Sequence, residues 1–491
     1  MNFRRLLFLG HRWLGIVLCL FMALWFVSGV VMMYVGYPKL TGAERLAALP
    51  PLPGAACCLS AADAVHRLPA GFDVRGLRLT TIAGEPYYVA SSGKNRFAAV
   101  HGAEGQILTT VDDELAHRSA AAYAPGARIV GSERLSEDAW THSRALDGHR
   151  PLIRVAFDDP TLKYLYVSGS TGEVVRDVSL TESRWNWAGA WLHWLYPLRG
   201  GAVDAWWTEI VIYTSLLSCV LAASGLTVGL LRWRRQPYRH GSHSPYRTGW
   251  LRWHHWLGLG FGVLTLTWIV SGLMSMNPWQ LFDSGAPRPA EARWQAASPA
   301  LAAAPKQVID CFRQDGLTPT ELAWLPVGDE LLIQARTAAG TRLLRDPASC
   351  TPFAQLSPAR LQQLGSATMP GTEVLAAHWQ TDYDWHYYVR EAHTMGGHQD
   401  KPLPVLQLRF DDAAGTWIYL DPASGRIVQR LDDRLRIKRW LFALLHSWDW
   451  LPLLERRPLW DGLLIVASLG GLAISVSGAV LGWRRLHRQN K

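Results

Sequence analysis

The sequence predicts an α-helical membrane protein with four transmembrane helices and α+β extracytoplasmic domains. Three observations lead to this fold class: four uncharged apolar runs, the confinement of acidic residues to two segments, and an internal repeat. The four runs cover residues 13–35, 210–231, 256–276 and 462–483. At a rise of about 1.5 Å per residue, each run matches the roughly 30 Å hydrocarbon core of a bilayer.

The charges orient these helices. The chain has 49 Lys and Arg against 40 Asp and Glu, and every acidic residue lies within 37–209 or 283–461. Arginines precede the first run, fill the short segment 232–252 and follow the fourth run. Because short basic segments stay in the cytoplasm, we expect a bacterial inner-membrane protein with both termini inside and two periplasmic domains. The net charge of +9 then reflects membrane orientation, and a nucleic-acid partner is not expected.

A cleavable signal peptide is the alternative interpretation of the first run, since Arg4 and Arg5 precede it. The run is longer than the about 7 to 15 apolar residues usual in such peptides, and no clear small-x-small cleavage site follows it. We therefore expect a retained helix.

The two halves of the chain repeat one pattern. The segment from His11 reads HRWLGIVLCLFMALWFVSGVVMM and that from His254 reads HHWLGLGFGVLTLTWIVSGLMSM, at an offset of 243. Across residues 157–224 the offset is 253, and it relates His193 to His446. We therefore predict two tandem repeats with pseudo-two-fold symmetry, each consisting of a transmembrane helix, an outer domain and a second transmembrane helix.

These patterns divide the chain into seven segments. They are a first transmembrane helix (1–36), a first outer domain (37–204), a second helix (205–232), a basic cytoplasmic loop (233–252), a third helix (253–277), a second outer domain (278–458), and a fourth helix with a cytoplasmic tail (459–491).

Both outer domains are expected to mix strands and short helices. Alternating apolar runs at 163–168 and 416–420 end in glycine-containing turns, which is typical of hairpins. Helices are expected at 60–67 and 305–314.

The six cysteines form no C-x-x-C or C-x-x-C-H motif, so neither a redox dithiol nor a covalently attached haem is predicted. Cys57, Cys58, Cys311 and Cys350 lie in the outer domains, where disulfides are permitted. Their spacing leaves the pairing open.

Several motifs occur in both copies and together indicate a family. In the first copy they are the H-x-W-L-G opening at 11–15, F-D-D at 157–159, Leu-His at 192–193, and the Ser-Gly to Trp-Arg-Arg segment at 224–235. As a set they resemble the PepSY-associated transmembrane family over nearly the whole chain. The resemblance implies PepSY-like outer domains. Some members resemble ferric-siderophore reductases of the bacterial inner membrane with b-type haems among the helices, and others have no assigned activity.

Four histidines are candidate haem ligands. A b-type haem in a helix bundle needs two imidazoles, one on each side of the macrocycle. His11 and His254 lie at the inner ends of their runs, whereas His193 and His446 lie just before the second and fourth runs, on the outer side. If the copies pack about an axis along the membrane normal, equivalent residues face each other. We therefore predict two bis-histidine b-type haems, one between His11 and His254 and one between His193 and His446.

Other interpretations of these histidines stay open. A histidine beside tryptophan at a membrane boundary can be a simple interfacial anchor. His255 could replace His254 as a ligand, but it aligns with Arg12, so we favour His254. From His11 to Met33 the helix would span about 33 Å, which would separate the two sites widely unless the helices tilt or the tryptophan-rich segment 185–194 dips inward.

A small-residue spacing recurs near the ends of the second and fourth runs. Gly225 and Gly229 correspond to Gly478 and Gly482. This spacing lets helices approach closely, so we expect the second and fourth helices to pack together.

The ten extra residues of the second copy are placed between His378 and His398. This segment also contains His386 and His393 among tyrosines and aspartates, a mixture of imidazole, phenolate and carboxylate that could bind ferric iron. We expect His386 and His393 to contact a ferric substrate. The alternative is a polar, aromatic loop at the membrane interface.

These features predict an inner-membrane di-haem oxidoreductase that passes electrons outward and reduces periplasmic ferric iron, as a ferric-siderophore complex or another ferric chelate, for iron release and uptake. No strand is followed by G-x-G-x-x-G, so a nicotinamide or flavin domain is not predicted. We expect a membrane quinol or a cytoplasmic flavoprotein as the electron donor, and lipid contact along the helices. The alternative is a haem-free PepSY membrane sensor, scaffold or regulator of envelope proteolysis.

Overall fold

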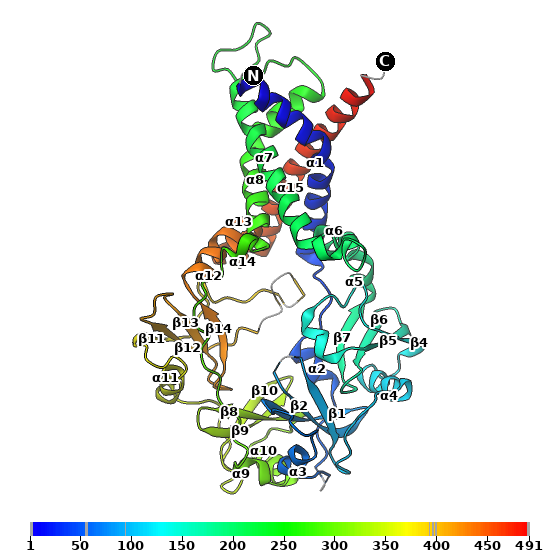
Figure 1. Cartoon of the computed structure of the whole chain (residues 1–491), viewed down its shortest axis with the longest axis vertical. Helices are drawn as coiled ribbons and strands as arrows, with labels where there is room; N and C mark the ends of the chain where they lie inside the picture. Colours follow the sequence, from blue (N-terminus) through cyan, green and yellow to red (C-terminus); the bar gives the residue numbers. More distant parts are fainter. Residues whose placement is uncertain are drawn as a thin grey trace.

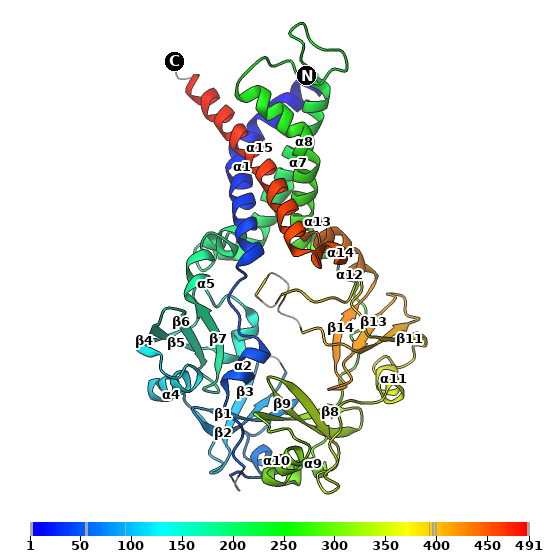
Figure 2. The same ribbon diagram turned by 180° about the vertical axis from the view of Figure 1, so that it is seen from behind.

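The computed structural model describes residues 3–54, 57–93, 95–391, 393–394, 397 and 400–488. It has a helical bundle at one end and two α+β lobes at the other (Figures 1 and 2). Four helices in the described chain are long and apolar enough to cross a membrane. They are α1 (Phe3–Tyr34), α7 (Trp207–Arg232), α8 (Trp250–Ser275) and α15 (Arg457–Arg488). The four predicted spans are confirmed, and the chain is a multi-pass membrane protein with soluble α+β domains.

The bundle has a ring-like order of helices. Helix α1 packs against α7 and α15, and α8 packs against the same two helices, so α1 and α8 lie on one diagonal and α7 and α15 on the other. The expectation that the second and fourth spans pack together is wrong, because their glycines face other neighbours. A Cβ on Gly229 would lie 3.2 Å from Leu259 of α8, and one on Gly482 would lie 3.1 Å from Ile16 of α1.

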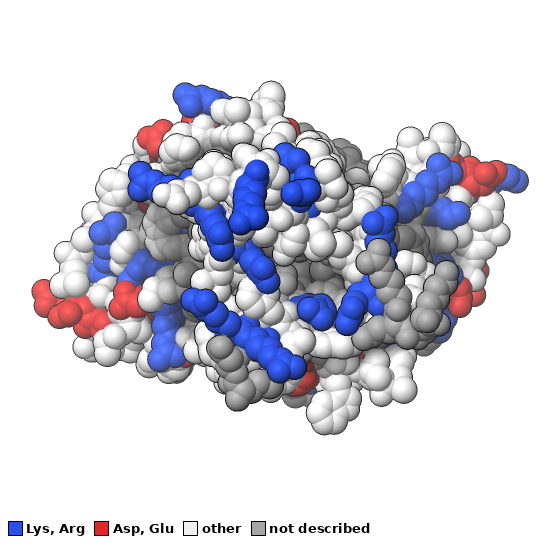
Figure 3. All heavy atoms as spheres, turned by 90° about the horizontal axis from the view of Figure 1, so that it is seen from above, with Lys and Arg blue, Asp and Glu red and all other residues white. Residues whose placement is uncertain are grey.

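The end of the bundle that carries both chain termini is basic (Figure 3). Its arginines come from the start of α1, the loop between α7 and α8, and the end of α15. This loop, residues 233–249, contains no Asp or Glu. Arginines from three separate parts of the sequence are therefore gathered on one face of the molecule.

The segment between α1 and α7 forms the first lobe, with three strands beside α3 and a four-stranded antiparallel sheet beside α4. Its elements are α2 (Gly42–Ala48), α3 (Ala61–His66), β1 (Gly76–Ile82), β2 (Glu85–Ser91), β3 (Phe97–His101), α4 (Asp113–Tyr123), β4 (Arg128–Leu135), η1 (Arg144–His149), β5 (Leu152–Asp158), β6 (Leu162–Ser168), β7 (Val174–Ser179), α5 (Leu180–Trp185), α6 (Ala190–His193), η2 (Tyr196–Leu198) and η3 (Asp204–Trp206). The predicted helix at 60–67 is α3, which Ser60 caps by accepting a hydrogen bond from the Asp63 N–H. The predicted strand at 163–168 is β6.

The segment between α8 and α15 forms the second lobe, with the same order of sheets. Its elements are η4 (Pro278–Gln280), α9 (Pro299–Ala302), α10 (Pro305–Gln314), β8 (Glu321–Val327), β9 (Glu330–Thr337), β10 (Gly340–Leu344), α11 (Pro358–Ala367), β11 (Val374–Gln380), β12 (Val405–Phe410), β13 (Trp417–Leu420), β14 (Ile427–Leu431), α12 (Asp433–Lys438), the π-helical turn η5 (Arg439–Leu444), α13 (Leu445–Ser447) and α14 (Leu451–Leu454). The predicted helix at 305–314 is α10, and the predicted strand at 416–420 is β13.

The two lobes share a sheet. Strand β1 pairs antiparallel with β8, with Leu77 opposite Trp324 and Leu79 opposite Leu322, and the sheet runs in the order β10-β9-β8-β1-β2-β3. An open edge strand leaves backbone N–H and C=O groups unpaired. Pairing β1 with β8 removes one edge from each three-stranded half. This shared sheet joins the outer segments 37–204 and 278–458.

A buried ion cluster lies at this junction. The carboxylate of Glu321 on β8 is fully buried and contacts three arginines, namely Arg45 at 2.8 Å, Arg78 at 3.1 Å and Arg336 at 3.2 Å. Burial would raise the pKa of Glu321, but the arginines outweigh burial and lower the pKa to about 2. Glu321 is therefore ionised at neutral pH and joins the first lobe to the second.

We expect Glu321→Gln to destabilise the joined lobes, because it leaves Arg45 and Arg336 without a buried counter-charge, while Arg78 keeps Glu173. Breaking a buried ion pair in this way costs about 3 to 5 kcal/mol, which thermal unfolding of the detergent-solubilised protein would detect. Because the folded pKa lies below the ordinary value of 4.5, this stabilisation is complete above that pH and is lost as the pH falls toward 2. The difference between variant and wild type should shrink over that window.

The matched control is Glu330→Gln on β9. Glu330 pairs with Arg345 and Arg360 near the surface, where such pairs contribute about 0 to 1 kcal/mol. Equal melting temperatures for Glu321→Gln and wild type at pH 7 would contradict the role assigned to the cluster.

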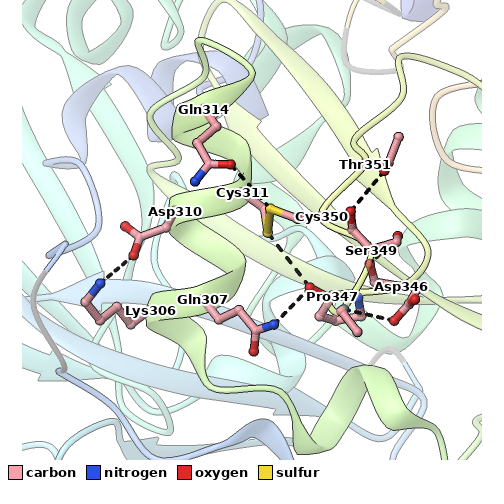
Figure 4. The surroundings of a disulfide bond; sticks show 11 residues. Lys306, Gln307, Asp310, Cys311, Gln314, Asp346, Pro347, Ser349, Cys350 and Thr351 are labelled. Atoms are coloured by element: carbon pink, nitrogen blue, oxygen red, sulfur yellow. Dashed lines mark hydrogen bonds and ion pairs between the residues drawn. A yellow bond between two sulfur atoms is a disulfide. The ribbon is translucent and has the colours of Figure 1, made fainter.

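Two disulfides lie in the lobes. Cys57 bonds Cys58, and Cys311 on α10 bonds Cys350 on the loop after β10. Figure 4 shows the second of them, with Gln307 on the same helix donating a hydrogen bond of 3.0 Å to the Pro347 carbonyl of that loop. The disulfide and the hydrogen bond both tie the loop to α10. Disulfides are typical of proteins in oxidising compartments.

Candidate functional site: paired histidines in the helix bundle

His11 and His254 meet inside the bundle near its basic end. His11 lies on α1 and His254 on α8, and their ring centroids are 6.3 Å apart with the ring planes at 38°. Since α1 and α8 occupy one diagonal of the bundle, the two rings meet across its interior. The structure therefore brings this predicted pair together.

His193 and His446 meet at the opposite end of the bundle. They lie on the short helices α6 and α13, and their ring centroids are 6.2 Å apart with the planes at 71°. Two residues after each histidine the backbone is left-handed, with φ of 53° at Leu195 and 51° at Trp448. A bulky residue rarely adopts this conformation, and such strain clusters at functional sites.

Tryptophans at the start of the neighbouring spans hold these two turns in place. The indole N–H of Trp207 donates to the Trp194 carbonyl at 2.8 Å, and that of Trp460 donates to the Ser447 carbonyl at 3.0 Å. Each accepting carbonyl lies one residue after a histidine of the pair. The start of each span thus fixes the position of the turn that precedes it.

The spacing of both pairs fits a metal held between two imidazoles. A metal lies about 2.0 Å from an imidazole nitrogen, which is itself roughly 1 Å from its ring centroid, so two opposed imidazoles have centroids about 6 Å apart. The observed separations are 6.3 Å and 6.2 Å. Both pairs therefore have the separation that a bis-histidine iron requires.

A serine determines which nitrogen of each ring is protonated. The Nδ1 of His193 lies 3.0 Å from the hydroxyl of Ser28, and that hydroxyl donates its own proton to the Leu24 carbonyl. The serine oxygen must then accept from Nδ1–H. This assignment, inferred from the hydrogen bonds, leaves Nε2 of His193 with a free lone pair.

The same arrangement occurs at the other three histidines. The distances from Nδ1 to the serine hydroxyl are 3.1 Å for His446 and Ser271, 2.9 Å for His254 and Ser477, and 3.4 Å for His11 and Ser224. Each of these serines also donates to a carbonyl of its own helix. Such outer hydrogen bonds commonly fix the tautomer and orientation of metal-binding histidines. All four rings are therefore prepared to ligate through Nε2.

A glycine follows each of these serines and makes room for the ring. A Cβ on Gly225 would lie 2.7 Å from Cε1 of His11, and a Cβ on Gly478 would lie 2.6 Å from Sγ of Cys19 and 3.3 Å from Cε1 of His254. In the outer pair the corresponding distances are 3.4 Å from Gly272 to His446 and 3.6 Å from Gly29 to His193. The Ser-Gly dipeptide is thus a histidine-binding element in each of the four spans.

His255 is held away from the inner pair. Its Nδ1 lies 2.9 Å from the Ser244 hydroxyl, and its Nε2 lies 2.9 Å from the Gly229 carbonyl. Both ring nitrogens therefore have partners, which leaves neither free for a metal. Ser244 belongs to the loop between α7 and α8, so His255 anchors that loop. These contacts favour His254 as the ligand.

A large cavity adjoins the outer pair. It contains about 1280 Å³ of space not filled by protein atoms, part of which is open to solvent, and both His193 and His446 line it. Its remaining walls are mostly apolar and aromatic, including Trp25, Phe26 and Trp268. A mostly apolar cavity with two imidazoles suits a large, flat, apolar macrocycle such as haem.

The two pairs lie at different depths along the bundle. His193 contacts Ser28 on α1, which lies 17 residues after His11. At about 1.5 Å per residue the separation is about 26 Å along the helix. The segment at 185–194 dips inward. Its helix α6 packs against α1 and places His193 beside Ser28, which lies five residues before Met33 on α1.

The histidines predicted to contact ferric iron make separate contacts. The ring of His386 packs edge-on against Trp417 and Trp440 in the second lobe. His393 instead contacts Glu44 of the first lobe at 2.6 Å and Glu182 at 3.7 Å. Hydrogen bonding to Glu182 and Glu44 raises the pKa of His393 to about 9. The ring is then protonated at neutral pH, and a protonated imidazole is a poor metal ligand.

Over its described residues, the segment that was predicted to bind iron contains no cluster of ligands. Among the described residues no group of three or more His, Cys, Asp or Glu is placed to hold a metal ion. His398, which marks the end of the predicted segment, lies outside the described residues.

Sequence reasoning missed the serines as partners of the histidines. Their signal was present, because Val-Ser-Gly and Ser-Gly occur in both copies at the same offsets as the histidines. The repeated pattern indicated that equivalent positions have a common structural role, but it did not show which side chains contact each other. Arg390, which also lines the outer cavity, has no such signal.

The fold and the site define a membrane protein whose helix bundle holds two pairs of interior histidines at different depths. The chain belongs to the family described as the PepSY-associated TM region, whose family model matches residues 8–395. The family resemblance noted from the motifs is thereby confirmed. No match was found among curated proteins.

Proposed function

We propose that this protein is a di-haem oxidoreductase of the bacterial inner membrane, which carries electrons outward and reduces periplasmic ferric iron, as a siderophore complex or another ferric chelate. The main support is the arrangement of the four histidines. Each has a serine on Nδ1, a glycine against its ring and a partner histidine at a centroid distance of 6.2 or 6.3 Å. A b-type haem bound between two such imidazoles supplies one-electron redox chemistry.

The protein's own groups have defined roles in this proposal. The histidines supply Nε2 as axial ligands, the serines hold the Nδ1 protons, and the glycines allow the rings to approach. The aromatic walls of the outer cavity exclude water, which helps to set a redox potential. Reduction is useful because ferrous iron is held less tightly than ferric iron by hard oxygen chelators, so the metal is released.

The two halves are proposed to be tandem copies. Their lobes have the same order of sheets, and the histidine, serine and glycine of each site recur at offsets of 243 and 253. Each Ser-Gly element binds a histidine of its own copy, whereas each pair joins one histidine from each copy. This pattern is expected for a pseudo-two-fold axis along the bundle.

The orientation in the membrane is proposed from charge. The basic end of the bundle (Figure 3) would face the cytoplasm by the positive-inside rule, and the disulfides would lie on the oxidising side. The inner pair then lies near the cytoplasm and the outer pair near the periplasm. All the strand pairs recorded in the described chain are antiparallel. A parallel nucleotide-binding sheet is thus missing from that part, so we propose a membrane quinol or a separate flavoprotein as the donor.

Proteoliposomes test the proposed direction of electron transfer. The purified protein would be reconstituted with a ferric chelate on the side of the lobes and a quinol in the bilayer, and ferrous iron would be measured with a colorimetric chelator. We expect reduction with wild type and loss of it with His446→Ala. A wild-type protein that holds two haems but reduces no ferric chelate would contradict the reductase assignment.

We expect the double change of His386 and His393 to Ala to slow reduction of an external ferric chelate about fivefold or more, with both haem spectra intact. The proposed reason is that this segment, which only the second copy contains, contacts the substrate. His101→Ala, on strand β3 of the first lobe, serves as the control. Unchanged reduction rates in the double variant would contradict substrate contact and favour the alternative, a polar, aromatic loop at the membrane interface.

A further inference from the structure

Arg390 is a charged side chain in an otherwise uncharged cavity. Among the described residues that line the cavity of the outer histidine pair, it is the only Lys, Arg, Asp or Glu. Its side chain is only 13% exposed. Burying a charge is costly unless the charge has partners, so its position requires an explanation.

The partners of Arg390 in the protein leave most of its donors free. One guanidinium nitrogen lies 3.3 Å from Asp449, whose side chain is 3% exposed, and the guanidinium carbon lies 5.8 Å from the Trp460 ring. Asp449 already accepts a hydrogen bond of 2.7 Å from the Tyr388 hydroxyl. In the described part of the chain no hydrogen bond from Arg390 is recorded beyond that ion pair. An arginine has five N–H donors, so several remain for a ligand in the cavity.

Residues that closely follow Arg390 in the sequence contact the first half of the molecule. The Gly36 N–H donates to the His393 carbonyl at 2.9 Å, and Lys39 donates to the Thr394 carbonyl at 3.1 Å. His393 also contacts Glu44 of the first lobe. Arg390 therefore lies three and four residues before His393 and Thr394, which contact the first half of the molecule.

We propose that Arg390 binds a carboxylate of the cofactor held by His193 and His446. The inference rests on the proposed function, since a b-type haem carries two propionate carboxylates. A guanidinium binds a carboxylate through two parallel hydrogen bonds, and burial strengthens them. Asp449 holds one side of the guanidinium, and the carboxylate takes the donors that face the cavity.

This contact makes the outer site chemically unlike the inner one. A buried positive charge beside a redox group favours its reduced form, because the reduced form carries one positive charge less. Arg390 thus raises the reduction potential of the outer group and favours electron flow toward it. The repeat supplies two similar histidine pairs, and the segment found only in the second copy distinguishes them.

The test compares haem with its dimethyl ester, in which both carboxylates are blocked. Apo-protein would be prepared from the full chain and titrated with each compound, and uptake at the outer site would be followed in a His254→Ala background. We expect the protein with Arg390 intact to bind haem about 10- to 100-fold more tightly than it binds the ester. Arg390→Gln should bind both compounds equally, at the affinity of the ester.

Arg457→Gln is the matched control, because Arg457 lies 5.4 Å from the same Trp460 ring but pairs with Glu391 and Asp461 and is not among the residues that line the cavity. It should retain the preference for haem. A second measurement, redox titration of the haem-loaded protein, should show a lower potential for the outer haem in Arg390→Gln only.

The outcomes separate this inference from the function on which it rests. If the wild type binds no haem at all, the proposed function fails. If the wild type holds two haems but binds haem and ester equally at the outer site, the function stands and the role of Arg390 is overturned. Arg390→Gln could instead change only the KM for a carboxylate-bearing ferric chelate and leave haem uptake unaltered. This result would mean that Arg390 binds a carboxylate of the substrate, and it would also overturn the proposed contact with the cofactor.

Discussion

His193→Ala and His446→Ala should each remove or convert the same haem, and His11→Ala and His254→Ala should each affect the other one. The reason is that each pair joins one histidine from each half, with centroids 6.2 and 6.3 Å apart. With one axial imidazole missing, the iron is under-coordinated and becomes high-spin or is lost. Absorbance and electron paramagnetic resonance spectra of the purified variants would show a change in about one of two haems.

Double variants make this prediction specific to the pairing. A double within a pair should resemble its single variants, whereas a double across pairs should lose both low-spin haems. The control is His255→Gln, which should keep both haems because this ring contacts Ser244 and Gly229 instead. If His11 and His193 behaved as one pair, the sites would lie within a copy and the pairing would be refuted.

Alanine at the four glycines should have graded effects, because the space beside each ring differs. Gly225→Ala places a methyl group 2.7 Å from Cε1 of His11, which is closer than real Cβ contacts. We expect the ring to shift and the inner haem to be depleted or to lose its low-spin bands. Gly29→Ala meets His193 at 3.6 Å, an ordinary van der Waals distance, and should keep both haems.

Haem content per chain and the low-spin bands measure this effect. Gly29→Ala is the control for Gly225→Ala, since both variants add one methyl group to a transmembrane helix beside a histidine. Equal loss in Gly225→Ala and Gly29→Ala would show that helix packing, and not the approach of the ring, decides the result.

The features that the sequence predicted well depend on local or repeated patterns. Uncharged runs of sufficient length specify spans regardless of their neighbours, so the four helices could be predicted. The histidine pairs could also be proposed, because the offsets of 243 and 253 relate His11 to His254 and His193 to His446. Equivalent positions across a two-fold axis meet without any further information.

The features that were missed depend on which neighbour a residue meets. The glycine spacing of the second and fourth spans indicates close packing but not its partner, and Gly229 faces Leu259 of α8. The pairing of β1 with β8 joins residues about 240 positions apart, and alternation alone does not select the partner of an edge strand. Arg390 lies in the segment to which the sequence alignment of the two halves assigns the extra residues of the second half, so this alignment could not point to it.

The central claim is that the two histidine pairs hold haem, and the absorbance spectrum of the detergent-purified protein tests it most directly. Reduced-minus-oxidised spectra, with haem quantified as its pyridine complex, should show about two b-type haems per chain with sharp low-spin bands. Purification from cells supplied with a haem precursor would ensure that cofactor supply is not limiting. A protein without haem under these conditions would contradict the claim and favour the haem-free sensor or scaffold.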